Sequence, residues 1–337
     1  MMPKDIQAWP ERLEIGAALA TDFYNHHKTM LPKSIKHVVF CGMGGSGIVG
    51  RIMKVFLDKK TTIRSDIIAS SDLPGCVDKE SLAIVVSYSG NTWETISVLK
   101  DLVESSVPVI VLAHGGRARE IAQEFNLPFV QLPESQTPRS ALSIFLGFVL
   151  TLFEKFGVFP GSEWIQAFVQ HAQRYIPKFA QASYFDEFLS IVQDLSFFHV
   201  WGISGDSSAV AYRAVTQFNE NSKMQVVYSE FPELCHNLLV GFTKVEVKAL
   251  VVMFYSAFLS ENIRRAVEAT SEILREKGAY LYKVPILGDT FEVQLFNMIL
   301  WADFASCHVG QARGVEVIPV RIIDNLKQVH RQKGIVI

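Results

Sequence analysis

The order of apolar and polar positions along the chain predicts an α/β protein. Short β-rich runs that end at glycine or serine, such as 37–41 and 82–86, are typical of strands, and segments with helical spacing follow them. The run 82–86 is apolar throughout, as in a strand buried on both faces. This alternation favours parallel βαβ units, so we expect mostly parallel sheets flanked by helices in three layers. In the first half, the predicted strands are 37–41, 66–69, 82–86, 107–112 and 129–132.

The second half repeats the plan of the first. Residues 197–208 match 37–46 as a strand that enters a turn of glycine and serine, with a helix over 209–218 behind it. Two copies of one α/β fold in tandem explain this order most simply. We predict domains at 1–155, with a leading helix, and at 156–337, with a C-terminal helix and tail. The further elements expected in this half are strands at 248–254 and 278–284 and helices at 261–277 and 291–307.

Composition and charge exclude several classes of protein. Hydrophobic residues make up 49% of the 337 residues and charged residues 20%, which supplies a full core and argues against disorder. The formal net charge of -2 argues against nucleic-acid binding, which is usually driven by a basic surface. The longest apolar run, 140–153, is shorter than the ~20 residues of a membrane span and predicts a buried helix.

The lack of a secretory signal pattern in the opening segment and the spacing of the cysteines favour a cytoplasmic location. The opening segment 1–14 is polar and amphipathic and has no apolar stretch of the kind that a secretory signal contains. The four cysteines are scattered and form no CxxC pair, which is typical of reduced thiols rather than of disulfides or a zinc site.

A glycine turn at 42–47 follows the first strand. Backbone N–H groups and the helix dipole converge at such a point, which favours an anion. The turn lacks the Gly-Lys-Ser/Thr of a Walker loop. The spacing of Gly42, Gly44 and Gly47 fits the GxGxxG dinucleotide pattern, but no acidic residue ends a neighbouring strand about 20 residues further on. The alternative is a tight turn that only lets the helix pack.

A second turn, at 87–92, carries hydroxyl groups where the strand 82–86 ends and a helix begins. Ligands of open α/β sheets bind at the carboxyl ends of strands, so we expect the two turns to surround one phosphate with neutral hydroxyl and amide donors. An ordinary capped helix is the alternative for the second turn, since Ser and Thr are common N-caps.

Five motifs carry a resemblance to a known family. GMGGSG at 42–47 and SYSGNTWET at 87–95 resemble the sugar isomerase (SIS) domain, a phosphosugar-binding α/β fold. TPRSAL at 137–142, FNENSK at 218–223 and FPELCHN at 231–237 narrow the resemblance. Together the motifs are similar, in order and over most of the chain, to the bifunctional phosphoglucose/phosphomannose isomerases, which are two tandem SIS domains.

The resemblance implies a role for individual residues. Arg139 matches the arginine beside the reacting carbons, and Glu220 matches the base that moves a proton between C1 and C2. His236 matches the histidine that opens the sugar ring and that the partner subunit of a homodimer supplies. Lys327 is the counterpart of a C-terminal lysine of the family's site. The residues that match the phosphate-binding positions are Gly45, Ser46, Ser87, Ser89 and Thr92.

Three positions depart from the family pattern. Arg51 stands where the family often has an aspartate after the glycine turn, and Trp93 replaces a usual acidic residue after SGNT. Ile318 occupies a place where a threonine is frequent. The first two change the surroundings of the phosphate turns.

The residue types suit the reaction that the resemblance implies, in which glucose 6-phosphate and mannose 6-phosphate interconvert with fructose 6-phosphate through a cis-enediol. A carboxylate removes a proton beside a carbonyl, a guanidinium stabilises the enediolate, and an imidazole titrates near neutrality, as ring opening requires. The reaction requires no metal or other cofactor, and none of the nine histidines forms an HxH or HExxH pattern. We therefore expect no metal site, no nucleic-acid partner and no membrane contact.

Two other functions fit the same features. One is another SIS-domain isomerase that acts on the phosphate of an amino sugar or a heptose. The other is a non-catalytic phosphosugar sensor, although no helix-turn-helix or basic arm precedes the first SIS-like half. Substrate assays separate the first alternative from the main one, and proton exchange at C2 separates the second.

Overall fold

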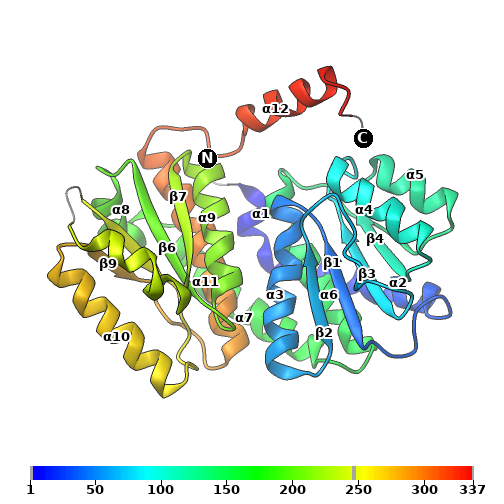
Figure 1. Cartoon of the computed structure of the whole chain (residues 1–337), viewed down its shortest axis with the longest axis horizontal. Helices are drawn as coiled ribbons and strands as arrows, with labels where there is room; N and C mark the ends of the chain where they lie inside the picture. The colour runs from blue at the N-terminus through cyan, green and yellow to red at the C-terminus, as the bar shows by residue number, and fades with distance from the viewer. Residues whose placement is uncertain (1–2, 245–247, 336–337) are drawn as a thin grey trace. The chain divides into compact units, whose positions relative to one another are not determined.

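The computed structural model describes residues 3–244 and 248–335 and contains two compact units. One unit, Ala8–Gln166 with Pro319–Ile337, holds a five-stranded sheet, and we call it the five-stranded unit. The other, Met1–Gln7 with Ala167–Ile318, holds a four-stranded sheet and is the four-stranded unit. Figure 1 labels the strands and helices of both. We predicted a domain boundary after residue 155. The division into compact units does not test where independently folding domains begin and end, so that boundary stays a prediction.

The strands of the five-stranded unit are all parallel and lie in the order β2-β1-β3-β4-β5. The sequence predicted each of them, with ends that differ by one or two residues. Their bounds are β1 His37–Cys41, β2 Arg64–Ile68, β3 Ser81–Val86, β4 Val109–Ala113 and β5 Phe129–Gln131.

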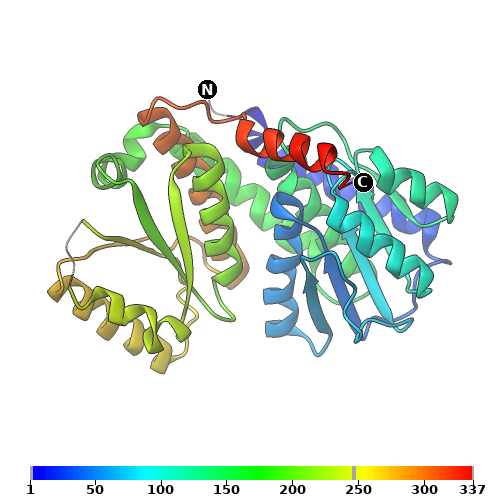
Figure 2. The ribbon, with the colours of Figure 1, turned by 45° about the horizontal axis from the view of Figure 1, so that its top comes forward.

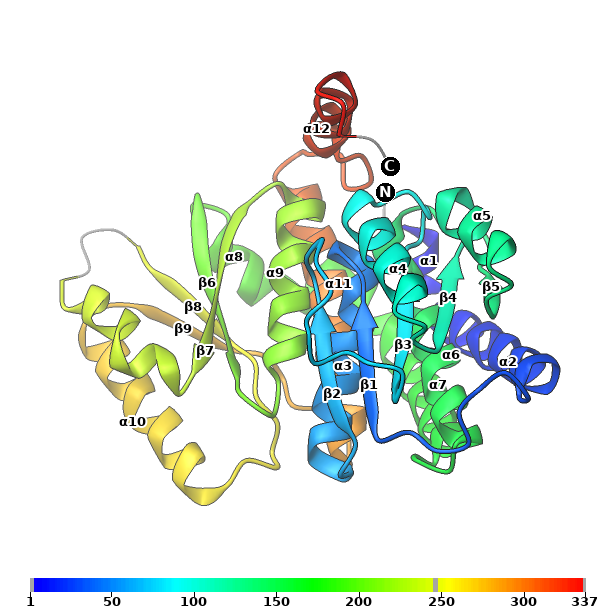
Figure 3. The same ribbon diagram turned by 45° about the vertical axis from the view of Figure 1, so that its right-hand side comes forward.

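Helices cover both faces of this sheet because successive strand residues point to opposite sides. In β1, Val39 and Cys41 belong to an apolar cluster with helices α4 and α5, whereas Phe40 stacks on Phe153 of helix α6. Figure 3 shows this sheet together with helices α4, α5 and α6. The run predicted as a buried helix is α6, whose residues up to Phe153 are buried, and no described helix is long and apolar enough to span a membrane. The helices are α2 Trp9–His27, α3 Gly44–Lys60, α4 Trp93–Glu104, α5 Gly116–Glu124 and α6 Leu142–Lys155.

The four-stranded unit repeats this topology, which confirms the tandem α/β prediction. Its parallel strands lie in the order β7-β6-β8-β9, which matches β2-β1-β3-β4 of the other sheet strand for strand. Its elements are β6 Phe197–Ile203, α9 Ser208–Ser222, β7 Gln225–Phe231, β8 Leu250–Met253, α10 Glu261–Glu276, β9 Tyr280–Lys283 and α11 Phe291–Ala312.

Among the strands and longer helices, the sequence analysis missed β7 and α12, and it ended α9 and α11 four and five residues early. β7 is an edge strand that mixes exposed, half-buried and buried positions and includes polar residues, so it lacks a continuous apolar run. Helix α12, Arg321–Gln332, was expected only as tail, and none of its residues is buried. Helix α9 continues past residue 218 to Ser222, so Glu220 lies within the helix and not after it. The remaining elements are α1 Lys4–Gln7, η1 Pro138–Ala141, α7 Gly161–Phe179, η2 Ala182–Phe185, α8 Asp186–Val192, η3 Glu233–His236 and η4 Leu238–Phe242.

Candidate active site

The first turn of the five-stranded unit contains a buried hydroxyl. Between β1 and α3, the Ser46 side chain is buried, and its Oγ accepts a hydrogen bond of 3.1 Å from the Tyr88 backbone N–H. Because this oxygen acts as an acceptor, its own O–H can donate to an anion. Tyr88 belongs to the turn after β3, so the bond holds the two predicted phosphate turns together.

Glycines allow close approaches of the backbone at the first turn. A Cβ at Gly47 would lie 2.4 Å from the carbonyl oxygen of Gly42, which is the packing role that the tight-turn alternative describes. A Cβ at Gly45 would lie 2.8 Å from the Cα of Arg139. The absence of a side chain at Gly45 therefore brings the segment of Arg139 directly against the turn.

The second turn lies between β3 and α4 and presents three hydroxyls. Ser87 is buried, and its Oγ donates to Thr92 Oγ1 at 3.3 Å. Ser89 is exposed, and its Oγ accepts from the Asn91 N–H at 3.2 Å. Gly90 adopts a φ of +70°, which a residue with a side chain rarely does, and fixes the tight course of the turn.

Neither helix that starts at these turns is capped by its N-cap side chain. Met43 is the N-cap of α3 and Thr92 is the N-cap of α4, and neither makes a side-chain capping hydrogen bond. An ordinary capped helix requires such a bond to the N2 or N3 backbone N–H. The geometry therefore favours the other explanation of this sequence, in which the helix starts face an anion.

Arg139 adds a positive charge beside the first turn. It lies in η1, a single turn held by a reciprocal capping box between Thr137 and Ser140. The residue is only 4% exposed, and its backbone lies against Gly45. A guanidinium is permanently charged, so its burial here adds a positive charge at a place that already favours an anion.

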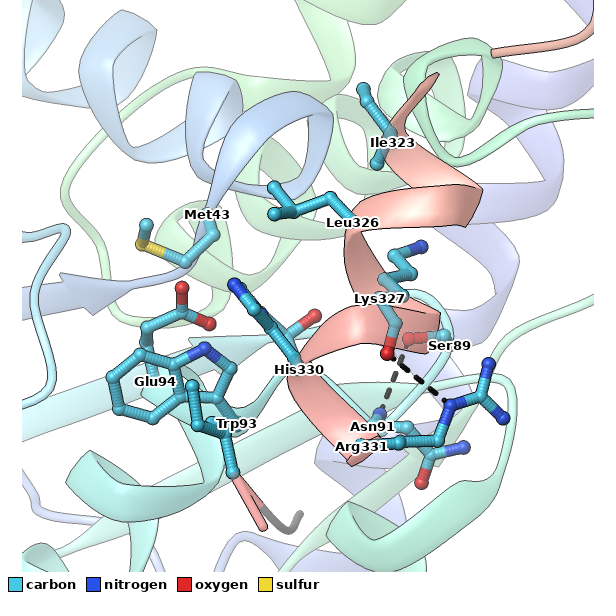
Figure 4. A pocket seen from close by; sticks show the side chains of 12 residues that line it. Met43, Ser89, Asn91, Trp93, Glu94, Ile323, Leu326, Lys327, His330 and Arg331 are labelled. Atoms are coloured by element: carbon cyan, nitrogen blue, oxygen red, sulfur yellow. Dashed lines mark hydrogen bonds between the residues drawn. The ribbon is translucent and has the colours of Figure 1, made fainter. Parts of the chain in front are cut away.

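A cavity of about 420 Å³ lies beside the second turn, and helix α12 forms its other wall. In Figure 2 the helix, drawn in red, lies over this end of the five-stranded unit. Figure 4 shows Lys327, His330 and Arg331 of α12 around the cavity, opposite Ser89 and Trp93. The structure thus brings the predicted Lys327 to the phosphate turns within one unit.

Sequence reasoning missed His330 and Arg331. They follow Lys327 by one helical turn, and this spacing places them on the same side of a helix. The basic residues at helical spacing were the available sign of a helix. The segment has no face that is buried, so the usual apolar pattern did not predict one there. Trp93, which departs from the family pattern, lines the same cavity, and its buried Nε1 has no hydrogen-bond partner among the described residues. No role follows for Arg51 or Ile318.

Glu220 lies in the four-stranded unit, half-buried in the last turn of α9. Its neighbours fix this turn: Asn219 Oδ1 accepts from the Val226 N–H at 2.9 Å, and Asn221 Nδ2 donates to Ser306 Oγ at 2.9 Å. The C-terminal end of a helix disfavours a carboxylate, because the helix dipole is negative there. Helix stability therefore does not explain the presence of an acid at this position.

His236 lies in the same unit, exposed at the end of η3. The adjacent Cys235 has a raised thiol pKa, chiefly because of burial, although a side-chain contact to Thr270 Oγ1 at 3.7 Å opposes the shift. Cys41, which ends β1 below the first turn, is fully buried, and burial raises its pKa to about 12. Neither thiol is thus poised as a thiolate nucleophile.

Within the described ranges, 3–244 and 248–335, no three His, Cys, Asp or Glu side chains form a group that could hold a metal ion. A metal-independent reaction stays a prediction that a chelator tests.

Comparisons with known proteins connect this geometry to a family. The SIS domain model matches residues 33–136, and the model of the bacterial phospho-glucose isomerase C-terminal SIS domain matches residues 189–329. The bifunctional phosphoglucose/phosphomannose isomerase of Caldicellulosiruptor bescii is 28% identical over 336 residues, which are 97% of this chain and 96% of the relative. The chain belongs to the bifunctional phosphoglucose/phosphomannose isomerase family.

The chain is also similar to a relative with another named activity and to a solved structure. The D-glucosamine-6-phosphate 4-epimerase of Sulfolobus acidocaldarius is 25% identical over 298 residues, with 88% of this chain and 90% of the relative covered. A crystal structure described as a putative phosphosugar isomerase from Clostridium difficile 630 matches with a TM-score of 0.76 over 97% of this chain and 98% of that one. At 14% sequence identity, that match shows the shared fold.

Proposed function

We propose that the chain is an aldose–ketose isomerase that interconverts glucose 6-phosphate and mannose 6-phosphate with fructose 6-phosphate. The observation that carries the proposal is the hydrogen bond from the Tyr88 N–H to Ser46 Oγ, which joins two hydroxyl-bearing turns in front of two helix starts without side-chain caps. A dianionic phosphate matches these donors. The family membership supports the choice of hexose phosphates.

The phosphate acts as the handle of the substrate. Gly45, Ser46, Ser87, Ser89 and Thr92 bind it in this proposal, so that the far end of the sugar reaches the reacting groups at a fixed distance. Holding a reactant in place contributes up to roughly 7–11 kcal/mol to lowering a barrier. The buried Arg139 beside Gly45 then lies within the substrate's reach and stabilises negative charge.

Proton transfer is assigned to Glu220. Its carboxylate removes the proton from C1 of the open-chain ketose or from C2 of the aldose, and the electron pair moves onto the carbonyl oxygen to form a cis-enediolate. Arg139 stabilises that oxyanion with its fixed charge. The hydroxyl proton passes from one of the two oxygens to the other, and the protonated Glu220, whose proton exchanges with solvent, protonates the neighbouring carbon. The proposal requires Glu220 to reach the sugar bound at the turns of the five-stranded unit.

His236 is assigned to ring opening, because an imidazole exchanges protons near neutral pH. We propose that the partner subunit of a homodimer supplies it, and its exposure at the end of η3 supports a role outside its own unit. Lys327 is assigned to the substrate's phosphate side, which its place in the wall of the cavity beside Ser89 supports. A cytoplasmic location also stays a prediction, made from the scattered cysteines.

Dual specificity follows from the intermediate. A planar enediolate has lost the configuration of C2, so a site that holds the C2 hydroxyl weakly accepts both aldoses. The similarity to the D-glucosamine-6-phosphate 4-epimerase favours a second candidate, an enzyme acting on an amino sugar phosphate.

Coupled assays test the proposal against this alternative. The chain is expected to convert both glucose 6-phosphate and mannose 6-phosphate to fructose 6-phosphate, at the same rate with and without a chelator. Loss of activity with the chelator would contradict the metal-independent mechanism. Turnover of glucosamine 6-phosphate, with neither hexose phosphate consumed, would favour the second candidate.

A further inference from the structure

The four-stranded unit contains a counterpart of the first phosphate turn. In the five-stranded unit, the N–H groups of Ser46 and Gly47 both donate to the Met43 carbonyl, at 3.1 and 3.3 Å. In the four-stranded unit, the N–H groups of Asp206 and Ser207 both donate to the Ile203 carbonyl, at 3.0 Å each. This shared pattern pairs the bonded residues of the two turns, although helix α3 already starts at Gly44 and helix α9 only at Ser208. Asp206 therefore takes the place of Ser46.

The partners of these two residues also correspond. Strand register pairs Cys41 with Val85 in one sheet and Trp201 with Met253 in the other. Three residues beyond Val85 is Tyr88, whose N–H donates to Ser46 Oγ at 3.1 Å. Three residues beyond Met253 is Ser256, whose N–H donates to Asp206 Oδ1 at 2.9 Å. The same backbone amide thus binds a hydroxyl in one unit and a carboxylate in the other.

The carboxylate is held in a closed and buried setting. Ser256 also donates through Oγ to Asp206 Oδ2 at 2.5 Å, and these two residues are 3% and 1% exposed. The adjoining Ser207 is 0% exposed, and its Oγ donates to the Phe254 carbonyl at 2.6 Å. A carboxyl group that accepts two hydrogen bonds from Ser256 therefore lies where the other unit presents a hydroxyl.

Two further N–H groups, in the loop after β8, are also bonded within the unit. The Ala257 N–H donates to Gln294 Oε1 at 2.8 Å, and the Phe258 N–H donates to Ser256 Oγ at 3.1 Å. Helix α10, the counterpart of α4, is capped by the Ser260 side chain, whereas Thr92 does not cap α4. The loop after β8 is therefore satisfied by groups of its own unit, although helix α9, like α3, has no side-chain cap.

We propose that the Asp206 carboxylate is an internal replacement for a bound anion, which closes the phosphate turn of the four-stranded unit and restricts anion binding to the turns of the five-stranded unit. An anion that hydrogen-bonded to the Ser256 N–H would lie next to the Asp206 carboxylate, which would repel it. The claim that a phosphosugar fills the remaining site rests on the proposed function, but the exclusion of inorganic phosphate by Asp206 does not.

Crystals soaked with inorganic phosphate test the proposal on the full chain. We expect phosphate at the turns of Ser46 and Ser87 in the wild type, and none beside Ser256. In Asp206→Ser, which copies the residue of the other unit, we expect a second phosphate that contacts the Ser256 N–H. Phosphate beside Ser256 in the wild type, or its absence there in a folded Asp206→Ser variant, would overturn the proposal.

The reciprocal substitution keeps the test independent of whether Asp206→Ser folds. Ser46→Asp is expected to weaken phosphate binding at least 100-fold in calorimetry, whereas Ser46→Ala, the control for the lost hydroxyl, weakens it less than tenfold. Equal losses in the two variants would overturn the proposal, because the charge would then have no effect. Titration with fructose 6-phosphate is expected to give one molecule per chain. If inorganic phosphate binds as described but fructose 6-phosphate does not, the proposed function fails and the role of Asp206 stands.

Discussion

The two units of the chain show how one fold serves two purposes. Each has a central parallel strand, a turn and a helix, and each turn is tied to the loop after the neighbouring strand by one backbone amide. In the five-stranded unit, that amide meets the hydroxyl of Ser46, and the helix starts lack side-chain caps. In the four-stranded unit, it meets the carboxylate of Asp206. In our proposal, the residue type at this one position distinguishes a turn that binds an anion from a turn that does not.

The scaffold carries the proposed base at the opposite end of the same helix. Asp206 precedes the start of α9, and Glu220 lies in its last turn. In the proposed function the two units divide the work: the five-stranded unit binds the phosphate, and the four-stranded unit contains Glu220 and His236. The predictions below test this division.

Replacing the proposed base gives the largest expected effect. Glu220→Gln keeps the size of the side chain but removes the carboxylate, so turnover should fall by about 10²–10⁴-fold, the usual worth of a general base. Affinity for fructose 6-phosphate, measured by calorimetry, should stay within about threefold, because the phosphate site lies in the other unit. Wild-type turnover in this variant would contradict the assignment of Glu220.

A buried ion pair joins helix α9 to helix α11 in the four-stranded unit. Arg213 donates through Nε to Asp303 Oδ1 at 2.9 Å, and both side chains are at most 1% exposed. Asp303→Ala leaves the guanidinium buried without its partner and should lower the free energy of unfolding by about 3–5 kcal/mol. Chemical denaturation measures this loss.

The double variant Arg213→Met with Asp303→Leu is the matched control. It removes both charges, so it should recover most of the stability that the single substitution loses. A single variant as stable as the wild type would show that the pair does not hold α9.

Gly45 and Gly205 occupy paired positions in the two turns, and their surroundings predict different effects of substitution. Gly205 has a φ of +67° and open space for a Cβ, so Gly205→Ala should cost only the strain of a left-handed backbone, about 1–2 kcal/mol of stability. At Gly45 a Cβ would instead press on the backbone of Arg139. Gly45→Ala should therefore reduce fructose 6-phosphate affinity and turnover, whereas Gly205→Ala should leave both unchanged. Equal functional effects would contradict the assignment of the phosphate site to one unit.

The smallest effect concerns pH. Burial lowers the pKa of His199 and of His171, and both lie in the four-stranded unit. An unfolded chain protonates histidine near pH 6.5, so below about that pH the unfolded state binds more protons and the folded state loses stability. His199→Asn should reduce the fall in melting temperature between pH 7.5 and pH 5.5. An unchanged pH dependence would show that His199 does not contribute to it.

The sequence predicted the sheets because buried parallel strands consist of continuous apolar runs, such as 82–86. It missed β7, where edge exposure lets polar residues enter, and α12, which buries no residue. The two turns that we assign to phosphate were also visible, because glycine and hydroxyl residues stood at strand ends. The role of Asp206 was not, since its meaning depends on Ser256, fifty residues away, and on a register that only the folded sheet defines.

Solvent exchange at the reacting carbons tests the central claim most directly. Fructose 6-phosphate is incubated with the wild-type chain in heavy water, and NMR follows the sugar carbons. The account predicts glucose 6-phosphate and mannose 6-phosphate that carry deuterium at C2, and no exchange with Glu220→Gln. Conversion by Glu220→Gln at the wild-type rate, or bound sugar that undergoes neither conversion nor exchange with the wild type, would contradict it.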